Sequence, residues 1–157
     1  MVIILFYSGS NGDGKRLLRE IESKIHGQRI EIVQTVQALS NLFRSPMIGR
    51  AIMVMMAEST EQLEELISMG DLMSDLPIFL VLPDRNPATV SIGRRLYPRF
   101  VAYVDSDFSD FVSVLSKLIH HGLFGNDQRE AALYTDFQNY RTTGWTQIPS
   151  TQSDGRK

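Results

Sequence analysis

The first residues that could support chemistry form a glycine-rich segment near the N-terminus. The segment reads Gly9-Ser10-Asn11-Gly12-Asp13-Gly14-Lys15-Arg16 and lies between a short apolar run and a stretch of helical periodicity. In such a turn the backbone N–H groups and the positive end of the helix bind phosphate, and a lysine adds charge on the phosphate oxygens. The candidate ligand-binding residues are therefore Gly9, Ser10, Gly12, Gly14 and Lys15.

The spacing of this segment matches the P-loop pattern of a glycine, four residues, a second glycine and a lysine. Arg16 stands where that pattern has a serine or threonine for magnesium, and Asp13 would repel phosphate from inside the loop. A plain turn, in which glycine supplies positive φ angles, explains the composition equally well. A turn and a nucleotide or other anion site therefore both stay open.

A third alternative is a flavin site. The segment resembles the first phosphate loop of flavodoxins, which has hydroxyl residues around a glycine after an aromatic strand end, as Tyr7, Ser10 and Gly12 have here. Flavodoxins also bring aromatic residues from later loops to the flavin, whereas loops 57–60 and 83–86 of this chain contain none.

Other catalytic chemistry has little support in the composition. The chain has no cysteine, which excludes disulfides, thiolate nucleophiles and cysteine-ligated zinc. Its three histidines, His26, His120 and His121, are too scattered to predict a metal site. We expect no cofactor, no metal and no enzymatic activity.

The length and charge predict one domain of ordinary composition. With 157 residues, of which 43% are hydrophobic and 22% charged, the chain is long enough for one well-formed core. A net charge of −2 gives no general attraction to nucleic acid or anionic lipid, so a nucleic-acid partner is not expected. The apolar run Val2–Tyr7 is too short to span a membrane. We expect a cytoplasmic protein without a membrane partner.

Strand-length apolar runs alternate with helical stretches, a pattern typical of a parallel sheet covered by helices. The predicted strands are Val2–Tyr7, Arg29–Gln34, Arg50–Ala57, Pro77–Leu82 and Phe100–Val104. Two of the helices between them are predicted at Val36–Phe43 and Pro87–Tyr97. The other three have apolar stripes at helical spacing: Leu17, Leu18, Ile21 and Ile25; Leu63, Leu66 and Ile67; and Phe108, Phe111, Val112, Leu115, Leu118 and Ile119.

Two helix starts and a domain boundary can also be predicted. Ser59 with Gln62 forms a capping box, and Asp107 is placed to cap the last helix, which Gly122 would end. Residues 1–124 form the predicted domain. Residues 125–157 form a C-terminal extension, with a short helix at 127–140 and then a flexible tail.

Residues 1–122 resemble the receiver domains of response regulators. The segment Ala102-Tyr103-Val104-Asp105-Ser106-Asp107-Phe108, followed by a long apolar helix, is similar to the end of the fifth receiver strand and its helix. The resemblance implies an α/β fold with a doubly wound, five-stranded parallel sheet, flavodoxin-like or receiver-like, in the order 2-1-3-4-5. It also implies a role in signalling.

The residues that carry receiver chemistry are replaced at the matching positions. Ser8 follows the first strand where an acidic pair would hold magnesium, and Ala57 with Glu58 stands where the phosphoacceptor aspartate would be. Leu82 replaces a threonine or serine, and Ser106 replaces a lysine. Phosphoryl transfer needs that carboxylate, that metal site and that cation. The resemblance therefore implies a pseudo-receiver that works without phosphorylation. Glu58 would either imitate a phosphorylated aspartate or be an ordinary exposed acid.

A group of arginines around the fourth helix and fifth strand suggests a contact surface. In receivers the face made by the fourth helix, fifth strand and fifth helix binds partners or a second copy. Arginine suits such surfaces because it stacks and forms forked hydrogen bonds. The predicted interaction residues are Arg94, Arg95, Arg99 and Tyr103, with Arg85 nearby and Tyr103 as a rotamer switch. The third helix carries the opposite charge, in Glu58, Glu61, Glu64, Glu65, Asp71 and Asp75. The predicted function is protein–protein interaction, either with another protein or in a homodimer; the alternative is a small nucleotide- or flavin-binding protein.

Overall fold

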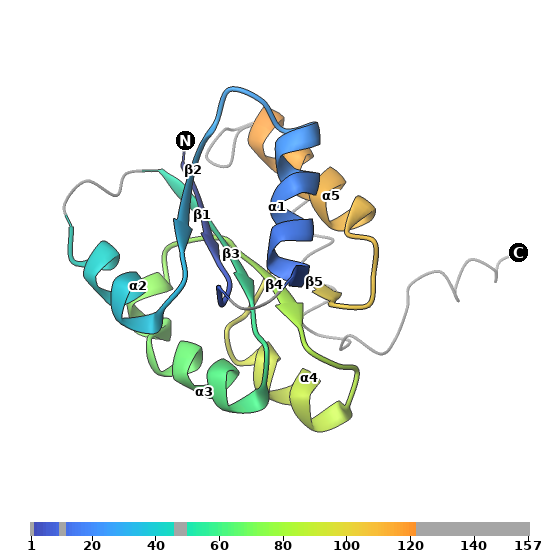
Figure 1. Ribbon diagram of the computed structural model, residues 1–157. Helices are drawn as coiled ribbons and strands as arrows, with labels where there is room; N and C mark the ends of the chain where they lie inside the picture. The colour runs from blue at the N-terminus through green and yellow to red at the C-terminus, as the bar shows by residue number, and fades with distance from the viewer. Residues whose placement is uncertain (1, 10–11, 46–49, 122–157) are drawn as a thin grey trace, which may run out of the picture.

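The sheet has five strands, all parallel. The computed structural model describes residues 2–9, 12–45 and 50–121. The strands are β1 (Val2–Phe6), β2 (Arg29–Val33), β3 (Ala51–Met56), β4 (Ile78–Leu82) and β5 (Phe100–Tyr103). They lie in the order β2-β1-β3-β4-β5, and every neighbouring pair is parallel (Figure 1). The predicted fold class and strand order are confirmed.

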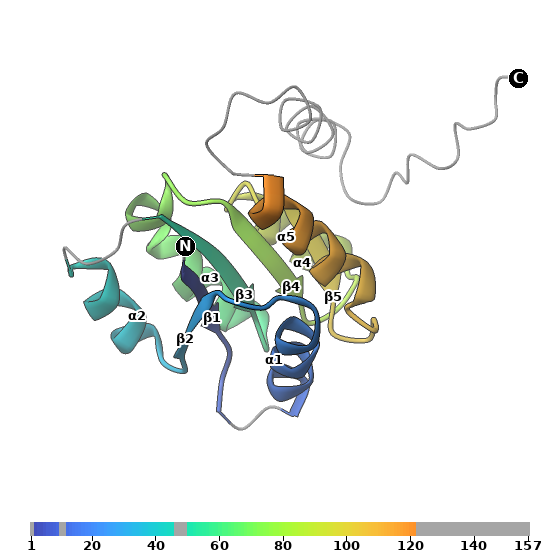
Figure 2. The same cartoon turned by 90° about the horizontal axis from the view of Figure 1, so that it is seen from above.

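Helices cover both faces of this sheet, as Figure 2 shows from above. Helices α1 (Gly12–Lys24) and α5 (Ser109–His121) lie on one face. Helices α2 (Val36–Phe43), α3 (Thr60–Ser68) and α4 (Pro87–Arg94) lie on the other, with the 3₁₀ turn η1 (Gly70–Met73) after α3. β3 and β4 are buried along their whole length because helices cover them on both sides.

The alternation of side chains along each strand divides the core into two clusters. On β1, Ile3 and Leu5 face α1 and α5, whereas Ile4 and Phe6 face the other three helices. The predicted stripe of α5 supplies Phe111, whose ring meets Phe79 edge to face at 5.5 Å. Both clusters are continuous, so the strand ends are held in fixed positions on either side.

The predicted element boundaries agree with the structure to within about one residue, with one larger difference. The fourth helix ends at Arg94 instead of Tyr97, because Leu96 and Tyr97 form turn hydrogen bonds to Gly93 and Arg94. Tyr97 has a φ of 51°, a left-handed conformation that no helix continues through. The turn η1 was not predicted.

Both predicted caps are present. The Ser59 hydroxyl accepts a hydrogen bond from the Gln62 N–H at 3.1 Å, and the Gln62 side chain accepts one from the Glu58 N–H at 2.8 Å. An Asp107 carboxylate oxygen accepts from the Ser109 N–H at 3.0 Å, at the start of α5. Gly122, the C-terminal extension 125–157 and its predicted helix lie outside the described residues. Within the described residues, no helix is long and apolar enough to cross a membrane.

Candidate functional site

The candidate site lies at the carboxyl edge of the sheet. Because all five strands are parallel, the loops that follow them meet at this one edge. Ser8, Ala57, Leu82 and Ser106 all stand at or just after strand ends, so the structure places them along it as the sequence predicted.

The two central positions of this edge are closed by apolar side chains. Ala57 and Leu82 are both fully buried and belong to the cluster beneath α2, α3 and α4. The Ala57 N–H donates to the Val81 carbonyl at 3.0 Å, which extends the ladder between β3 and β4. Neither side chain offers an oxygen that could act as a nucleophile or ligate a cation.

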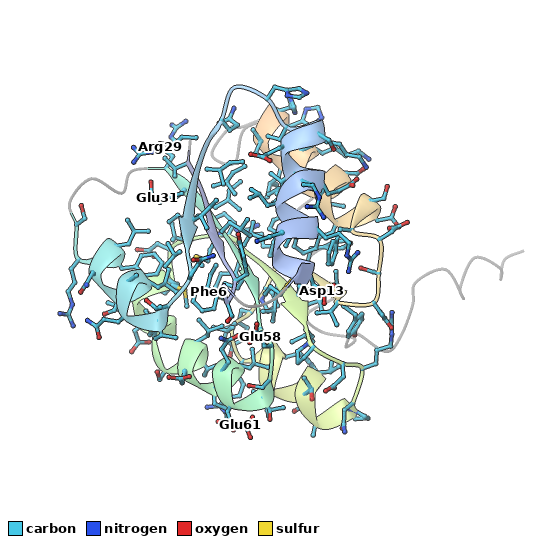
Figure 3. All side chains as sticks on the ribbon, in the orientation of Figure 1. Phe6, Asp13, Arg29, Glu31, Glu58 and Glu61 are labelled. Atoms are coloured by element: carbon cyan, nitrogen blue, oxygen red, sulfur yellow. The ribbon has the colours of Figure 1, made fainter. Side chains whose placement is uncertain are left out.

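Glu58 does not share the buried position of its neighbour Ala57. Its side chain is exposed, and it directly precedes Ser59, the N-cap of α3. Figure 3 shows Glu58 at the edge where β3 leads into α3. This position favours the interpretation of Glu58 as an ordinary exposed acid near a helix N-terminus.

Ser106, just after β5, closes a turn. Its hydroxyl donates to the Tyr103 carbonyl at 2.8 Å, and its N–H donates to the same oxygen at 2.9 Å. The side chain therefore stabilises the turn after β5.

A positively charged side chain, that of Arg16, reaches this edge from helix α1. Its guanidinium donates to the Val104 carbonyl at 2.6 Å and to the Ser106 carbonyl at 2.7 Å. It also lies 4.3 Å from the centre of the Phe108 ring and pairs with Asp13 at 3.1 Å. Arg16 thus ties α1 to the β5–α5 loop through contacts 88 and 90 residues away in sequence.

A second arginine holds the other side of the same loop. The Arg85 guanidinium lies 4.2 Å from the centre of the Tyr103 ring and donates to Asp105 at 2.8 Å. Burial raises the pKa of Tyr103 above its ordinary value of 10.0; Arg85 opposes that increase and Asp105 adds to it. The β5–α5 loop is therefore held between two arginines, Arg16 from helix α1 and Arg85 from the loop between β4 and α4.

The glycines of the glycine-rich loop do not have the positive φ angles that the sequence suggested. None of Gly9, Gly12 and Gly14 has a positive φ; among the glycines in the described ranges only Gly27 does. The positive φ angles expected for a plain turn are therefore absent at these three glycines.

Gly14 is required by packing instead. A Cβ there would lie 2.1 Å from Cδ2 and 2.3 Å from Cγ of the Tyr7 ring, so only glycine lets α1 approach the end of β1. Gly12, the first residue of α1, has open space around it, and Lys15 is exposed. Ser10 lies outside the described residues.

The predicted interaction residues separate into two places. Helix α4 follows β4 and runs back along the sheet, so Arg94, Arg95 and Arg99 lie at the amino edge while Tyr103 lies at the carboxyl edge. Arg94 and Arg95 are exposed, and Arg99 is partly buried. The structure thus groups Tyr103 with Arg85, and separates it from Arg94, Arg95 and Arg99.

Comparison with known proteins gives no family for this arrangement. No family model, curated protein or solved structure matches the chain. In the part of the chain that the structure describes, no three side chains of histidine, aspartate or glutamate gather where they could hold a metal ion.

Sequence reasoning missed the roles of Arg16 and Phe108. In the sequence, Arg16 stands out only as a departure from the P-loop pattern, and Phe108 only as a match to a receiver pattern and as the first residue of the apolar stripe predicted for the last helix. The one local signal for Arg16 was its position three residues after Asp13, which places both side chains on one face of a helix. Its contacts with β5 had no local signal.

Proposed function

We propose that this chain is a non-catalytic regulatory module, a pseudo-receiver that acts in the cytoplasm by protein–protein contact and without phosphorylation. The observation that carries the proposal is the character of the carboxyl edge. Ala57 and Leu82 are buried and apolar there, and Arg16 is bound to backbone carbonyls instead of being directed at a ligand.

The contacts of Arg16 count against transfer of a phosphoryl group. A catalytic cation must face the place where charge develops in the transition state. The guanidinium of Arg16 contacts two carbonyl oxygens, a carboxylate and an aromatic ring, all of which belong to the fold itself. Releasing it would cost the hydrogen bonds that hold the β5–α5 loop.

Two arginines at the end of α4 support a contact function. Arg94, the last residue of α4, and Arg95, which follows it, are both exposed, so their side chains can reach carboxylates on another protein. An exposed arginine at an interface contributes through stacking and forked hydrogen bonds more than through net charge. Arg94 and Arg95 are therefore the proposed contact residues.

The test is an amide NMR titration of the full chain with magnesium and beryllofluoride, then with Mg-ATP, then with FMN. We expect no saturable shifts at Ser8–Arg16, Ala57 or Ser106. Saturable shifts with beryllofluoride would overturn the claim of phosphorylation independence. Saturable shifts with Mg-ATP or FMN that disappear in Lys15→Ala would establish the glycine-rich loop as a ligand site instead.

A further inference from the structure

Charge is strongly segregated along the middle of the chain. Residues 51–84 contain no lysine, arginine or histidine, and their acidic residues are Glu58, Glu61, Glu64, Glu65, Asp71, Asp75 and Asp84. Residues 85–104 contain no aspartate or glutamate, and their basic residues are Arg85, Arg94, Arg95 and Arg99. The first stretch forms β3, α3, η1 and β4, and the second forms α4 and β5.

The fold places the acidic and the basic helix side by side. α3 and α4 contact each other on one face of the sheet (Figure 1). Glu64 of α3 and Arg95, which follows α4, approach to 3.9 Å across the line between the helices. Both side chains are 60% exposed, so this pair marks the boundary but contributes little to stability. Figure 3 shows Glu61 on the outer side of α3, away from the sheet.

Apolar side chains are exposed at one end of this boundary. Leu72 is 49% exposed and Tyr97 65%, and the only other large exposed hydrophobic residue in the described ranges is Ile32 on the edge strand β2. Gly70 of η1 lies beside Leu96, since a Cβ on Gly70 would be 4.0 Å from Leu96 Cδ2. The turn that carries Leu72 is therefore next to the residue that precedes Tyr97.

Tyr97 is exposed, and its backbone conformation is unfavourable. Its φ of 51° is a left-handed value that a residue with a Cβ adopts at a cost of about 1 kcal/mol. Tyr97 thus combines an exposed aromatic ring with a strained backbone. Aromatic residues are enriched at the centres of protein interfaces.

We infer that this α3–α4 surface, made by Glu61, Glu64, Leu72, Arg94, Arg95 and Tyr97, is a self-complementary docking site for a second copy of the chain. The inference rests on the proposed function and names its partner. A two-fold axis that lies in the interface and runs along the boundary would set α3 of each copy against α4 of the other. The acids of each copy would then face the arginines of the other. Leu72 and Tyr97, near the axis, would lie against the same two residues of the second copy.

The charge arrangement is what selects a second copy as the occupant. A surface of one sign repels its own copy, whereas a surface divided into an acidic and a basic half attracts it when the halves are exchanged. The boundary pair Glu64–Arg95 can exchange partners between copies without leaving either charge unpaired. This dimer differs from the one expected through α4, β5 and α5, because its acidic half comes from α3.

The test is sedimentation velocity on the full chain, from about 1 µM to about 1 mM, a range that covers weak and transient interfaces. Two variants reverse one half each: Glu61→Arg with Glu64→Arg, and Arg94→Glu with Arg95→Glu. We expect the wild-type sedimentation coefficient to rise with concentration. Each variant alone should associate at least about 100-fold more weakly, because like charges would face each other. An equimolar mixture of the two variants should associate again.

Matched controls change the same number of charges elsewhere. Glu22→Arg with Glu31→Arg, and Arg19→Glu with Arg29→Glu, alter α1 and β2. Each control should associate as the wild type does, and an equimolar mixture of the two controls should associate no more strongly than either control alone. Far-ultraviolet circular dichroism should show the same folded spectrum for all variants, because every reversed residue of the α3–α4 surface is exposed.

The outcomes separate this inference from the function on which it rests. A wild-type chain that stays monomeric over the whole range overturns the dimer but leaves a contact with another protein as the function. Self-association that the reversals do not affect also overturns it, since another surface would then be used. The proposed function itself fails only if the ligand titrations give saturable shifts.

Discussion

The guanidinium of Arg16 lies over the ring of Phe108, 4.3 Å from its centre, and joins the first helix to the start of the last. Phe108 is 1% exposed and has a φ of 63°, so this residue of the turn into α5 is buried and has a left-handed backbone. The two carbonyls that Arg16 binds, those of Val104 and Ser106, belong to the same turn. Arg16 therefore stabilises a turn in which Phe108 has a backbone conformation that a residue with a Cβ does not favour.

Replacing Arg16 with alanine should lower the free energy of unfolding by about 1–2 kcal/mol. Hydrogen bonds from a charged donor contribute more than neutral ones, but the side chain is 38% exposed and water partly replaces them. Urea denaturation gives the change directly. Lys15→Ala, on the neighbouring exposed position of the same helix, should change stability by less than about 0.5 kcal/mol. Equal effects of the two substitutions would show that the Arg16 contacts do not stabilise the fold.

Gly14→Ala should be among the most damaging small substitutions in the chain. The new Cβ would lie within 2.3 Å of two Tyr7 ring atoms, so α1 or the ring must move, at a cost of about 2–3 kcal/mol. Gly12→Ala is the matched control, because nothing lies within 4 Å of a Cβ there. It should be neutral or stabilise the chain by up to about 1 kcal/mol. Thermal melts of both variants decide the matter, and a melting temperature of Gly14→Ala equal to that of the wild type would contradict the predicted clash.

Tyr103 should titrate later than an exposed tyrosine. Burial raises its pKa above 10.0, so the unfolded chain loses this proton at a lower pH than the folded chain does. The contribution of Tyr103 to stability is complete below pH 10 and is lost as the pH rises from 10.0 through the raised pKa. Absorbance at the tyrosinate band should show a late step that disappears in Tyr103→Phe.

The neighbours of Tyr103 allow a test of the cause. Arg85 lowers the pKa of Tyr103 and Asp105 raises it, both less strongly than burial raises it. Arg85→Ala should therefore move the late step to higher pH, and Asp105→Asn should move it to lower pH. A late step that neither substitution moves would assign it to another of the five tyrosines.

Two substitutions of Tyr97 should separate the effect of its backbone on stability from the effect of its ring on self-association. Tyr97→Gly and Tyr97→Ala both remove the ring, but only glycine accepts a φ of 51° without strain. The glycine variant should be more stable than the alanine variant by about 1 kcal/mol in denaturant titrations. Both should weaken self-association equally. If the alanine variant associates as the wild type does, the ring takes no part in the α3–α4 surface.

Much of the fold follows from patterns that are local in sequence. The continuous apolar runs of β3 and β4 indicate strands buried on both faces, and the stripe of α5 indicates the helix that covers them. Ser59 and Asp107 mark helix starts because a capping side chain bonds to an N–H two or three residues later. The end of α4 was harder to predict because Leu96 continues its apolar spacing, although Tyr97 turns out of the helix.

The candidate site was predictable in position but not in chemistry. The strand ends identified Ser8, Ala57, Leu82 and Ser106 as neighbours along one edge, since parallel strands end together. Which cation would reach that edge was not visible, because Arg16 arrives from α1 and meets residues 88 and 90 positions later. The reason for Gly14 was equally hidden, since a close approach to Tyr7 depends on how α1 packs against β1.

The amino-acid sequence by itself determined the α/β class and, within the described residues, the five strands and five α-helices, because hydrophobic periodicity and capping act over a few residues. It also determined that acids and arginines occupy separate stretches. Only the tertiary structure decided that α3 and α4 lie side by side, so that Glu64 meets Arg95 and an acidic and a basic half share one surface. Contacts between residues far apart in the chain depend on the order of the strands and on the packing of each helix over the sheet, and no short stretch of sequence encodes either.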